Sequence, residues 1–143
     1  MVDQKFIDFI NEHHVLTLAS SAGNQPYCCN CFYAYNSSDN IFVIKTNEGT
    51  RHEREINLNS HIAASVVLET SEIGKIQGLQ ITGKAIYYTG RDLDEAKKTY
   101  LKKFPYAIAA PGEYLVLEPD FMKLTDNRFG FGKKLTWNKV NNG

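Results

Sequence analysis

The sequence predicts an α+β, mainly β domain: an antiparallel β-barrel of six or seven strands with a few short flanking helices. Two observations support this prediction. Short apolar, β-branched segments are separated by turn clusters of Gly, Asn, Ser and Asp, which is typical of antiparallel strands. Only about three segments show helical spacing of their apolar residues, too few to place a crossover helix after every strand.

Length and composition limit the class of protein. The 143 residues suit a single domain over 1–143, because domains span ~100–200 residues. Sixteen basic and sixteen acidic residues give no net charge, which argues against a non-specific nucleic-acid binder. No apolar run reaches ~18 residues, and the N-terminus lacks the continuous apolar stretch of a signal peptide. We therefore expect a cytoplasmic protein that does not bind membranes.

The first part of the chain predicts one helix followed by three strands. Apolar residues recur at helical spacing from Val2 to Ile10, and Asp3 is a suitable N-cap. Turn clusters separate the three strand segments, so these are expected to form an antiparallel meander. The predicted strands are His14–Ser20, Pro26–Asn36 and Ile41–Thr46.

The rest of the chain predicts two more helices and further strands. A capping box of Thr50 and Glu53 starts a helix that ends near Asn59, and a second helix starts at Asp92 and ends before Pro105. The segment 129–137, near the end of the chain, is rich in glycine, basic and aromatic residues. The predicted strands are Ile62–Thr70, Ile76–Thr89, Glu113–Leu117 and Met122–Thr125.

The predicted strand Ile76–Thr89 has one apolar and one polar face. Apolar residues from Leu79 onward alternate with polar ones such as Gln80. Gly78 and Gly83 inside this strand indicate bulges or a close approach of the backbone.

The segment from Lys45 and Thr46 to His52 is a candidate binding site. Here a strand ends, a glycine turn follows, and a helix begins at Thr50 with Arg51 and His52 in its first turn. A helix N-terminus already carries a positive partial charge, so a basic first turn is unfavourable for the helix itself. A bound anion such as phosphate would balance these charges. The alternative is two surface cations beside a capping box.

Cys28, Cys29 and Cys31 lie together in the second predicted strand. Because side chains alternate along a strand, Cys29 and Cys31 share a face and Cys28 points to the other. At most two thiols can reach one metal ion, and no second cysteine pair completes a zinc site, so we predict no metal site. A redox role stays open beside the interpretation of the thiols as small apolar strand residues.

The segment 130–134 superficially resembles a phosphate-binding loop. Asn127 stands at the position of the first glycine and no Ser or Thr follows Lys133, so we reject a nucleoside triphosphatase. Lys133, Lys134 and Trp137 are candidates for the wall of a pocket for a planar anion. The alternative is a strand end with solvated lysines and a core tryptophan.

Five segments together resemble a known family: Asn30–Tyr35, Lys45–His52, Gly78–Ala85, Lys102–Tyr106 and Thr125–Trp137. Over nearly its whole length the chain resembles the pyridoxamine 5′-phosphate oxidase-like, FMN-binding split β-barrel superfamily, and within it the YhbP-like branch. The resemblance implies a split barrel that forms a homodimer with two FMN sites at the subunit interface.

The resemblance also implies cofactor contacts along the chain. Two residues of the second strand lie beside the flavin ring, the end of the third strand contacts FMN, and the helix start binds the phosphate. The polar face of the long strand reaches the flavin edge, and the last segment approaches from the partner subunit. The implied cofactor-binding residues are Asn30, Phe32, Lys45, Thr46, Thr50, Arg51, His52, Gln80, Lys133, Lys134 and Trp137.

One position departs from the family pattern. His52 stands where relatives often place a lysine, so phosphate binding would depend on Arg51 and the helix N-terminus, and FMN affinity is expected to be weaker.

The expected function is that of an FMN-dependent oxidoreductase acting on a small-molecule electron donor and acceptor. No catalytic residue is predicted, because hydride or electron transfer by a flavin requires no dedicated acid or base. Two alternatives stay open: a flavin- or haem-binding protein without turnover, and a ligand-free dimerisation module. A haem role would require a histidine ligand.

Overall fold

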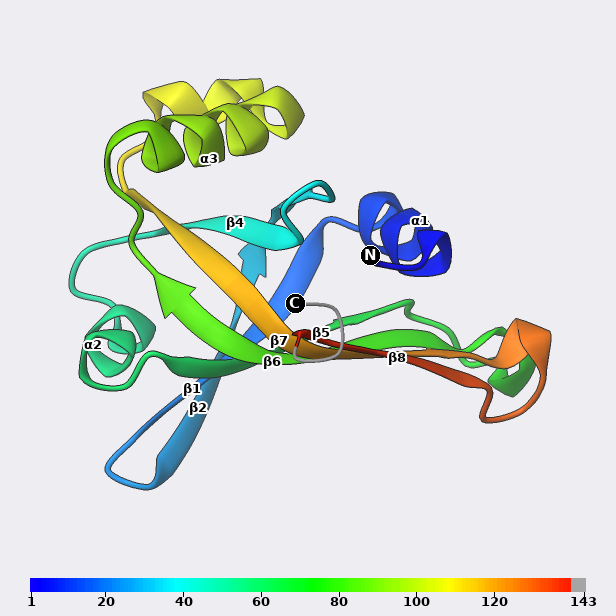
Figure 1. Ribbon diagram of the computed structural model, residues 1–143. Coiled ribbons are helices and arrows are strands. Elements are labelled where there is room, and N and C mark those ends of the chain that lie inside the picture. Colours follow the sequence, from blue (N-terminus) through cyan, green and yellow to red (C-terminus); the bar gives the residue numbers. More distant parts are fainter. Residues whose placement is uncertain (140–143) are drawn as a thin grey trace.

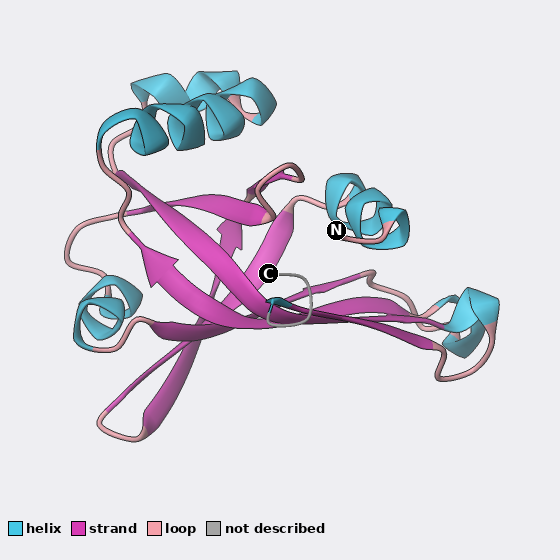
Figure 2. Ribbon diagram, viewed as in Figure 1, coloured by secondary structure: helices cyan, strands magenta, loops and turns pink. Residues whose placement is uncertain are grey.

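The structure of the protein is a computed structural model that describes residues 1–139 (Figure 1). All of its strands belong to one eight-stranded antiparallel sheet, and the helices lie around the outside of this curled sheet (Figure 2). The strands are β1 (Val15–Ala22), β2 (Gln25–Phe32), β3 (Ala34–Asn36), β4 (Ile41–Thr46), β5 (His61–Val67), β6 (Gln77–Ile86), β7 (Glu113–Asp126) and β8 (Lys134–Asn138). The α-helices are α1 (Gln4–Glu12), α2 (Arg51–Leu58) and α3 (Gly90–Lys103), and short 3-10 helices cover Ile73–Lys75, Pro105–Ala109 and Asn127–Phe129.

The sheet curls back on itself because its two end strands are consecutive in the chain. The strand order is β2-β1-β5-β6-β7-β4-β3, with β8 also paired to β7, and only Tyr33 separates β2 from β3. The backbone N–H of Tyr33 donates to the carbonyl of His14 (3.0 Å), and its hydroxyl donates to the carbonyl of Ile10 (2.7 Å). This corner closes the barrel, so the antiparallel α+β barrel predicted from the sequence is confirmed.

The same corner shows that one predicted strand is wrong. The segment Pro26–Asn36 is not one strand, because the buried Tyr33 separates β2 from β3 and these lie at opposite ends of the strand order. The antiparallel pairings expected of the meander are present, between β1 and β2 and between β3 and β4, but they do not lie side by side. Two later strands are shorter than predicted and end at Val67 and Ile86.

The predicted strands Glu113–Leu117 and Met122–Thr125 form a single long strand, β7. Strand β4 pairs with β7 as far as Leu117, and β8 pairs with it from Phe121 onward. Pro119 therefore lies between two pairings and opposite a register shift in β6, a position where a sheet tolerates proline.

The backbone approaches closely at one of the two glycines singled out in β6. A Cβ added to Gly83 would lie 2.1 Å from the carbonyl oxygen of Glu118, which confirms the prediction there. A Cβ at Gly78 would meet nothing closer than 3.8 Å, and the register shift lies at Gly83, so the prediction is wrong for Gly78.

Side-chain caps fix the starts of two helices as predicted. Asp3 accepts a hydrogen bond from the backbone of Lys5 (2.8 Å), and Thr50 accepts one from the backbone of Glu53 (3.4 Å). The third helix begins two residues before the predicted Asp92, at Gly90, and has no side-chain cap.

Two apolar clusters form the core. The larger fills the barrel beneath α1, and the smaller lies between the sheet and α3. Strand β4 contributes to both, with Phe42 and Ile44 facing the barrel and Ile41 and Val43 facing α3. Burial on both faces explains why β4 is a continuous apolar run.

Candidate functional site

The start of α2 gathers four of the residues predicted to bind a cofactor: Thr46, Thr50, Arg51 and His52. Thr46 ends β4 and its hydroxyl lies 3.3 Å from that of Tyr87. The first intrahelical bond runs from the N–H of Arg54 to the carbonyl of Thr50 (3.2 Å). The N–H groups of Arg51 and His52 precede this bond, and such groups are free to bind an anion.

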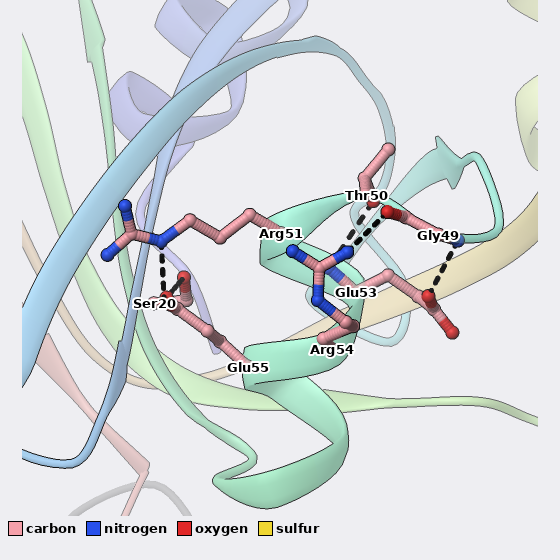
Figure 3. A network of polar contacts seen from close by, with 7 residues as sticks. All are labelled: Ser20, Gly49, Thr50, Arg51, Glu53, Arg54 and Glu55. Atoms are coloured by element: carbon pink, nitrogen blue, oxygen red, sulfur yellow. Dashed lines mark hydrogen bonds and ion pairs between the residues drawn. The ribbon is translucent and has the colours of Figure 1, made fainter.

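A turn at Gly49 holds this helix start in place. The carboxylate of Glu53 accepts from the backbone N–H of Gly49 (3.1 Å), and the guanidinium of Arg54 donates to the carbonyl of Gly49 (2.5 Å). Gly49 has a φ of +84°, which favours glycine. The capping network therefore fixes the loop that joins β4 to α2 (Figure 3).

The guanidinium of Arg51 is held between two side chains (Figure 3). Its Nε donates to Glu55 (2.8 Å), and its Cζ lies 4.3 Å from the centre of the Tyr27 ring. Glu55 is itself buried and accepts a second hydrogen bond from the hydroxyl of Ser20 (2.7 Å). The Arg51 side chain remains 45% exposed, and Figure 3 shows its two terminal nitrogens directed away from Glu55.

The pKa values of Glu55 and His52 are both lowered, but for different reasons. Hydrogen bonds from Arg51 and Ser20 lower the pKa of Glu55, so its carboxylate stays charged and paired. Burial lowers the pKa of His52, and its Nε2 lies 3.4 Å from the Thr50 hydroxyl oxygen. At neutral pH the site therefore combines a permanent cation with a neutral imidazole.

Lys45 does not join this cluster. It precedes Thr46 on β4, so its side chain points to the other face of the strand. There its ammonium donates to the carbonyls of Ala107 (3.0 Å) and Ala110 (2.7 Å). In this structure Lys45 anchors the segment that follows α3.

Three other predicted residues share the outward face of the sheet. Asn30, Gln80 and Lys134 all point away from the barrel. Asn30 and Gln80 lie in one register row, which crosses the sheet as Asn30, Thr17, Ser65, Gln80, Lys123 and Thr136. Phe32 shares the face of Asn30 and contacts the ring of Phe104 (5.5 Å between centroids).

The C-terminal candidates are not brought together. Lys133 precedes β8 and is exposed, and Lys134 lies on the outward face of that strand. Trp137 lies on the opposite face, where it is half-buried against the core. The three side chains therefore do not form one wall within a single chain.

Sequence reasoning missed three residues that complete the α2 site: Ser20, Tyr27 and Glu55. Glu55 could have been predicted from the sequence, because a carboxylate four residues after an arginine on a helix can pair with it. Ser20 and Tyr27 come from the β1–β2 hairpin, and only the tertiary structure places them beside α2.

The cysteines divide between the faces of β2 as predicted. Cys28 is exposed, whereas the sulfurs of Cys29 and Cys31 lie 3.9 Å apart on the inward face. Among residues 1–139, no group of three or more His, Cys, Asp or Glu side chains is placed to hold a metal ion. No helix of that same range is long and apolar enough to cross a bilayer.

Sequence comparison assigns the chain to a family. A UPF0306 protein of Photorhabdus laumondii is 33% identical over 131 residues, which is 92% of either chain. The chain belongs to the UPF0306 family. A UPF0306 protein of Yersinia pestis is 31% identical over 132 residues, covering 92% of this chain and 90% of the relative. No sequence-family profile matches the chain.

Solved structures show that this UPF0306 protein has the split-barrel fold implied by the resemblance. A heme binding protein from Mycobacterium smegmatis aligns with a TM-score of 0.76 at 16% identity, covering 90% of this chain. The alignment spans only 54% of that protein's length. A FAD-binding protein from Mesorhizobium loti aligns with a TM-score of 0.69 at 13% identity, covering 85% of this chain and 90% of that protein.

Proposed function

We propose that this UPF0306 protein is a single-domain FMN-binding protein of the YhbP-like branch and an FMN-dependent oxidoreductase. One observation carries the proposal. The guanidinium of Arg51 is oriented by Glu55 and Tyr27, its side chain is 45% exposed, and its two terminal nitrogens are directed away from Glu55. The shared fold with FAD- and heme-binding proteins supports a cofactor of this kind.

The α2 site fits the phosphate of FMN. Arg51 supplies a permanent charge and a planar set of donors suited to phosphate oxygens. The N–H groups of Arg51 and His52 and the helix dipole add a positive potential. Glu55 reduces the net charge at this point, but it accepts from the Nε of Arg51 and from Ser20, and the two terminal nitrogens of Arg51 are directed away from it.

Bound FMN would supply hydride or electron transfer, which this chain's side chains do not provide. The chain's own residues bind and orient: Arg51, Thr50 and His52 at the phosphate, with Thr46 at the adjacent strand end. Glu55 and Ser20 act as positioning residues, because they hold the guanidinium and do not face the ligand. The electron donor and acceptor are proposed to be small molecules.

The second half of the proposal is a homodimer. Asn30 and Gln80 lie on the outward face of the sheet, away from the Tyr27 face that contacts Arg51. A second copy seated on this outward face would bring its own α2 site and C-terminal strand toward these residues. In this arrangement Asn30, Phe32, Gln80, Lys133 and Lys134 contact FMN across the interface, whereas Trp137 faces the core and takes no part.

The test is FMN retention. The purified protein is mixed with FMN and desalted, and its visible absorption spectrum is recorded for the wild type and for Arg51→Ala. Arg51→Ala should weaken FMN binding by about tenfold to a hundredfold, the value of a charge-assisted hydrogen bond. Arg91→Ala is the matched control, because Arg91 is exposed at the start of α3. His52→Lys should strengthen binding, since it restores the cation that relatives often carry.

A wild type that passes FMN through unbound, or an Arg51→Ala variant that binds as tightly as Arg91→Ala, would show that the phosphate assignment is wrong. Turnover is measured separately, as oxidation of a nicotinamide donor by the FMN-loaded protein. Loaded protein without turnover would identify a flavin carrier.

One observation favours haem as a second candidate. His52 is half-buried and its pKa is lowered, so a neutral imidazole nitrogen is available as a ligand. Haem and flavin have different visible spectra, and the variants separate them further. His52→Ala should abolish a haem spectrum and leave flavin retention nearly unchanged, whereas Arg51→Ala should weaken flavin retention.

A further inference from the structure

A cavity beside α3 lies apart from the α2 site. It has a volume of about 720 Å³ and is bounded by α3, by β3 with its following turn, and by the corner between α1 and β1. Figure 1 shows α3 and α2 well apart on the barrel. We name it the α3 groove, after the helix that contributes its three lysines. The polar side chains that line it are Asn11, His14, Tyr35, Asn36, Ser37, Lys98, Thr99, Lys102 and Lys103.

The α3 groove concentrates positive charge in a chain that has none overall. Three lysines and a histidine line it, and within residues 1–139 no carboxylate does. The nearest acidic residues on α3 are Asp94 and Glu95, one turn before Lys98, and neither is part of the lining. The ion pairs of the described chain all lie elsewhere, at Arg51, Lys75 and Arg128.

Lys103 is built into the floor of this groove. Its ammonium donates to the carbonyls of His13 (2.8 Å) and Tyr33 (2.9 Å), which uses two of its three N–H donors. It also lies 4.5 Å from the centre of the Tyr33 ring. Burial lowers the pKa of Lys103 to about 8. The ammonium is therefore fixed in place and partly desolvated, which strengthens its attraction for an anion.

The donor set suits a compact anion of high charge. Lysine ammoniums bind phosphate oxygens as point charges. The groove offers three of them and no arginine. Its volume falls within the roughly 300–1,000 Å³ typical of small-molecule sites.

We propose that the α3 groove binds a phosphorylated small molecule carrying two or more negative charges. Lys103 forms the fixed anchor at the floor, and Lys98 and Lys102 close over the anion from α3. Ser37 contributes a hydroxyl donor from the opposite wall, whereas the hydroxyl of Thr99 already donates to the carbonyl of Glu95 (3.0 Å). This site is independent of the proposed FMN site and does not require it.

The experiment is an NMR titration of the ¹⁵N-labelled chain with pyrophosphate. The Arg51→Ala variant is used, so that the α2 site does not compete for the probe. Saturable shifts are expected at the amides of Ser37 and Thr99. Shifts confined to residues 47–54, or no saturable shifts at all, would overturn the proposal.

A variant set separates a specific site from general attraction to a basic helix. Replacing Lys98 and Lys102 by Gln should weaken pyrophosphate binding about tenfold or more, because each removed charge lies at the anion. Lys97→Gln is the control on the same helix, since the Lys97 ammonium points to the Tyr114 ring (5.9 Å) outside the groove. Equal weakening by Lys97→Gln would contradict the proposal.

Discussion

At the residue scale, Glu55 links the stability of the protein to the candidate site. It is buried, yet it stays ionised because Arg51 and Ser20 both donate to its carboxylate. Removing either partner would leave part of a buried charge unsatisfied. Glu55, which orients the Arg51 guanidinium that we propose binds phosphate, therefore also contributes to the stability of the fold.

The first prediction concerns acid unfolding. Folding lowers the pKa of Glu55 below its ordinary value of 4.5, so the carboxylate stabilises the native state above that pH and the contribution is lost as pH falls below it. Glu55→Gln should therefore lower the urea midpoint at pH ~7 and have a smaller effect at pH ~4. Comparison with the wild type isolates Glu55, because Asp126 also has a lowered pKa and is present in both proteins. A gap between the two proteins that widens toward acid would contradict the assignment.

Residue-scale prediction succeeded where the relevant partners are close in sequence. The capping box of Thr50 and Glu53 could be identified because its members lie three residues apart. The role of Lys45 could not, because its acceptors at Ala107 and Ala110 follow more than sixty residues later. From the sequence alone, Lys45 and Thr46 look alike as strand-end residues. In the structure their side chains lie on opposite faces of β4 and contact different elements.

At the element scale, the two glycines of β6 have different surroundings. Gly83 faces the backbone of Glu118 at the register shift, where no side chain fits. Gly78 has ordinary space around its Cβ position. Their opposite environments could not be distinguished by composition, because both glycines lie in an alternating apolar strand.

The second prediction follows from this pair. Gly83→Ala should destabilise the protein by about 3 kcal/mol or more, since the new Cβ meets a backbone oxygen that cannot move freely. Gly78→Ala should be neutral or stabilising by up to about 1 kcal/mol, because alanine loses less entropy on folding. Urea unfolding of the two variants measures both effects. Similar losses in the two variants would show that the clash at Gly83 is relieved by backbone movement.

Two strand predictions failed for one physical reason. Tyr33 looks like any residue of an aromatic strand, but its backbone and hydroxyl bond to His14 and Ile10 and end the strand there. Conversely, Pro119 looks like a residue that ends a strand. It lies between the pairings of β7 with β4 and with β8, so neither neighbour needs a backbone N–H donor at this position. In both cases the partner strand, which is distant in sequence, decides the local structure.

At the scale of the whole molecule, the outward face of the sheet is the surface on which we propose that a second copy binds. Its central row runs through small and polar side chains, with Thr17 donating to Asn30 (2.9 Å) and Ser65 between Thr17 and Gln80. The proposed dimer and the proposed flavin contacts therefore share this row.

The third prediction tests that arrangement. Ser65→Arg should convert the dimer to a monomer and reduce FMN retention at the same time, because a long charged side chain would stand in the centre of the interface. Ser71→Arg introduces the same side chain at an exposed loop position and should change neither property. Light scattering coupled to size exclusion measures the mass. A Ser65→Arg protein that remains dimeric would place the interface on another face.

The single residue between β2 and β3 also bears on how the protein resists aggregation. Edge strands expose N–H and C=O groups that recruit strands of other chains. Here the two edges of the sheet order meet at Tyr33, so their ends lie at most roughly 7 Å apart along the backbone, and β3 is only three residues long. An incoming strand that pairs with β3, or with β2 near Phe32, soon meets the other edge. The covalent link that closes the barrel thus limits strand addition at this corner, whereas β8, which within residues 1–139 pairs only with β7, forms a separate edge.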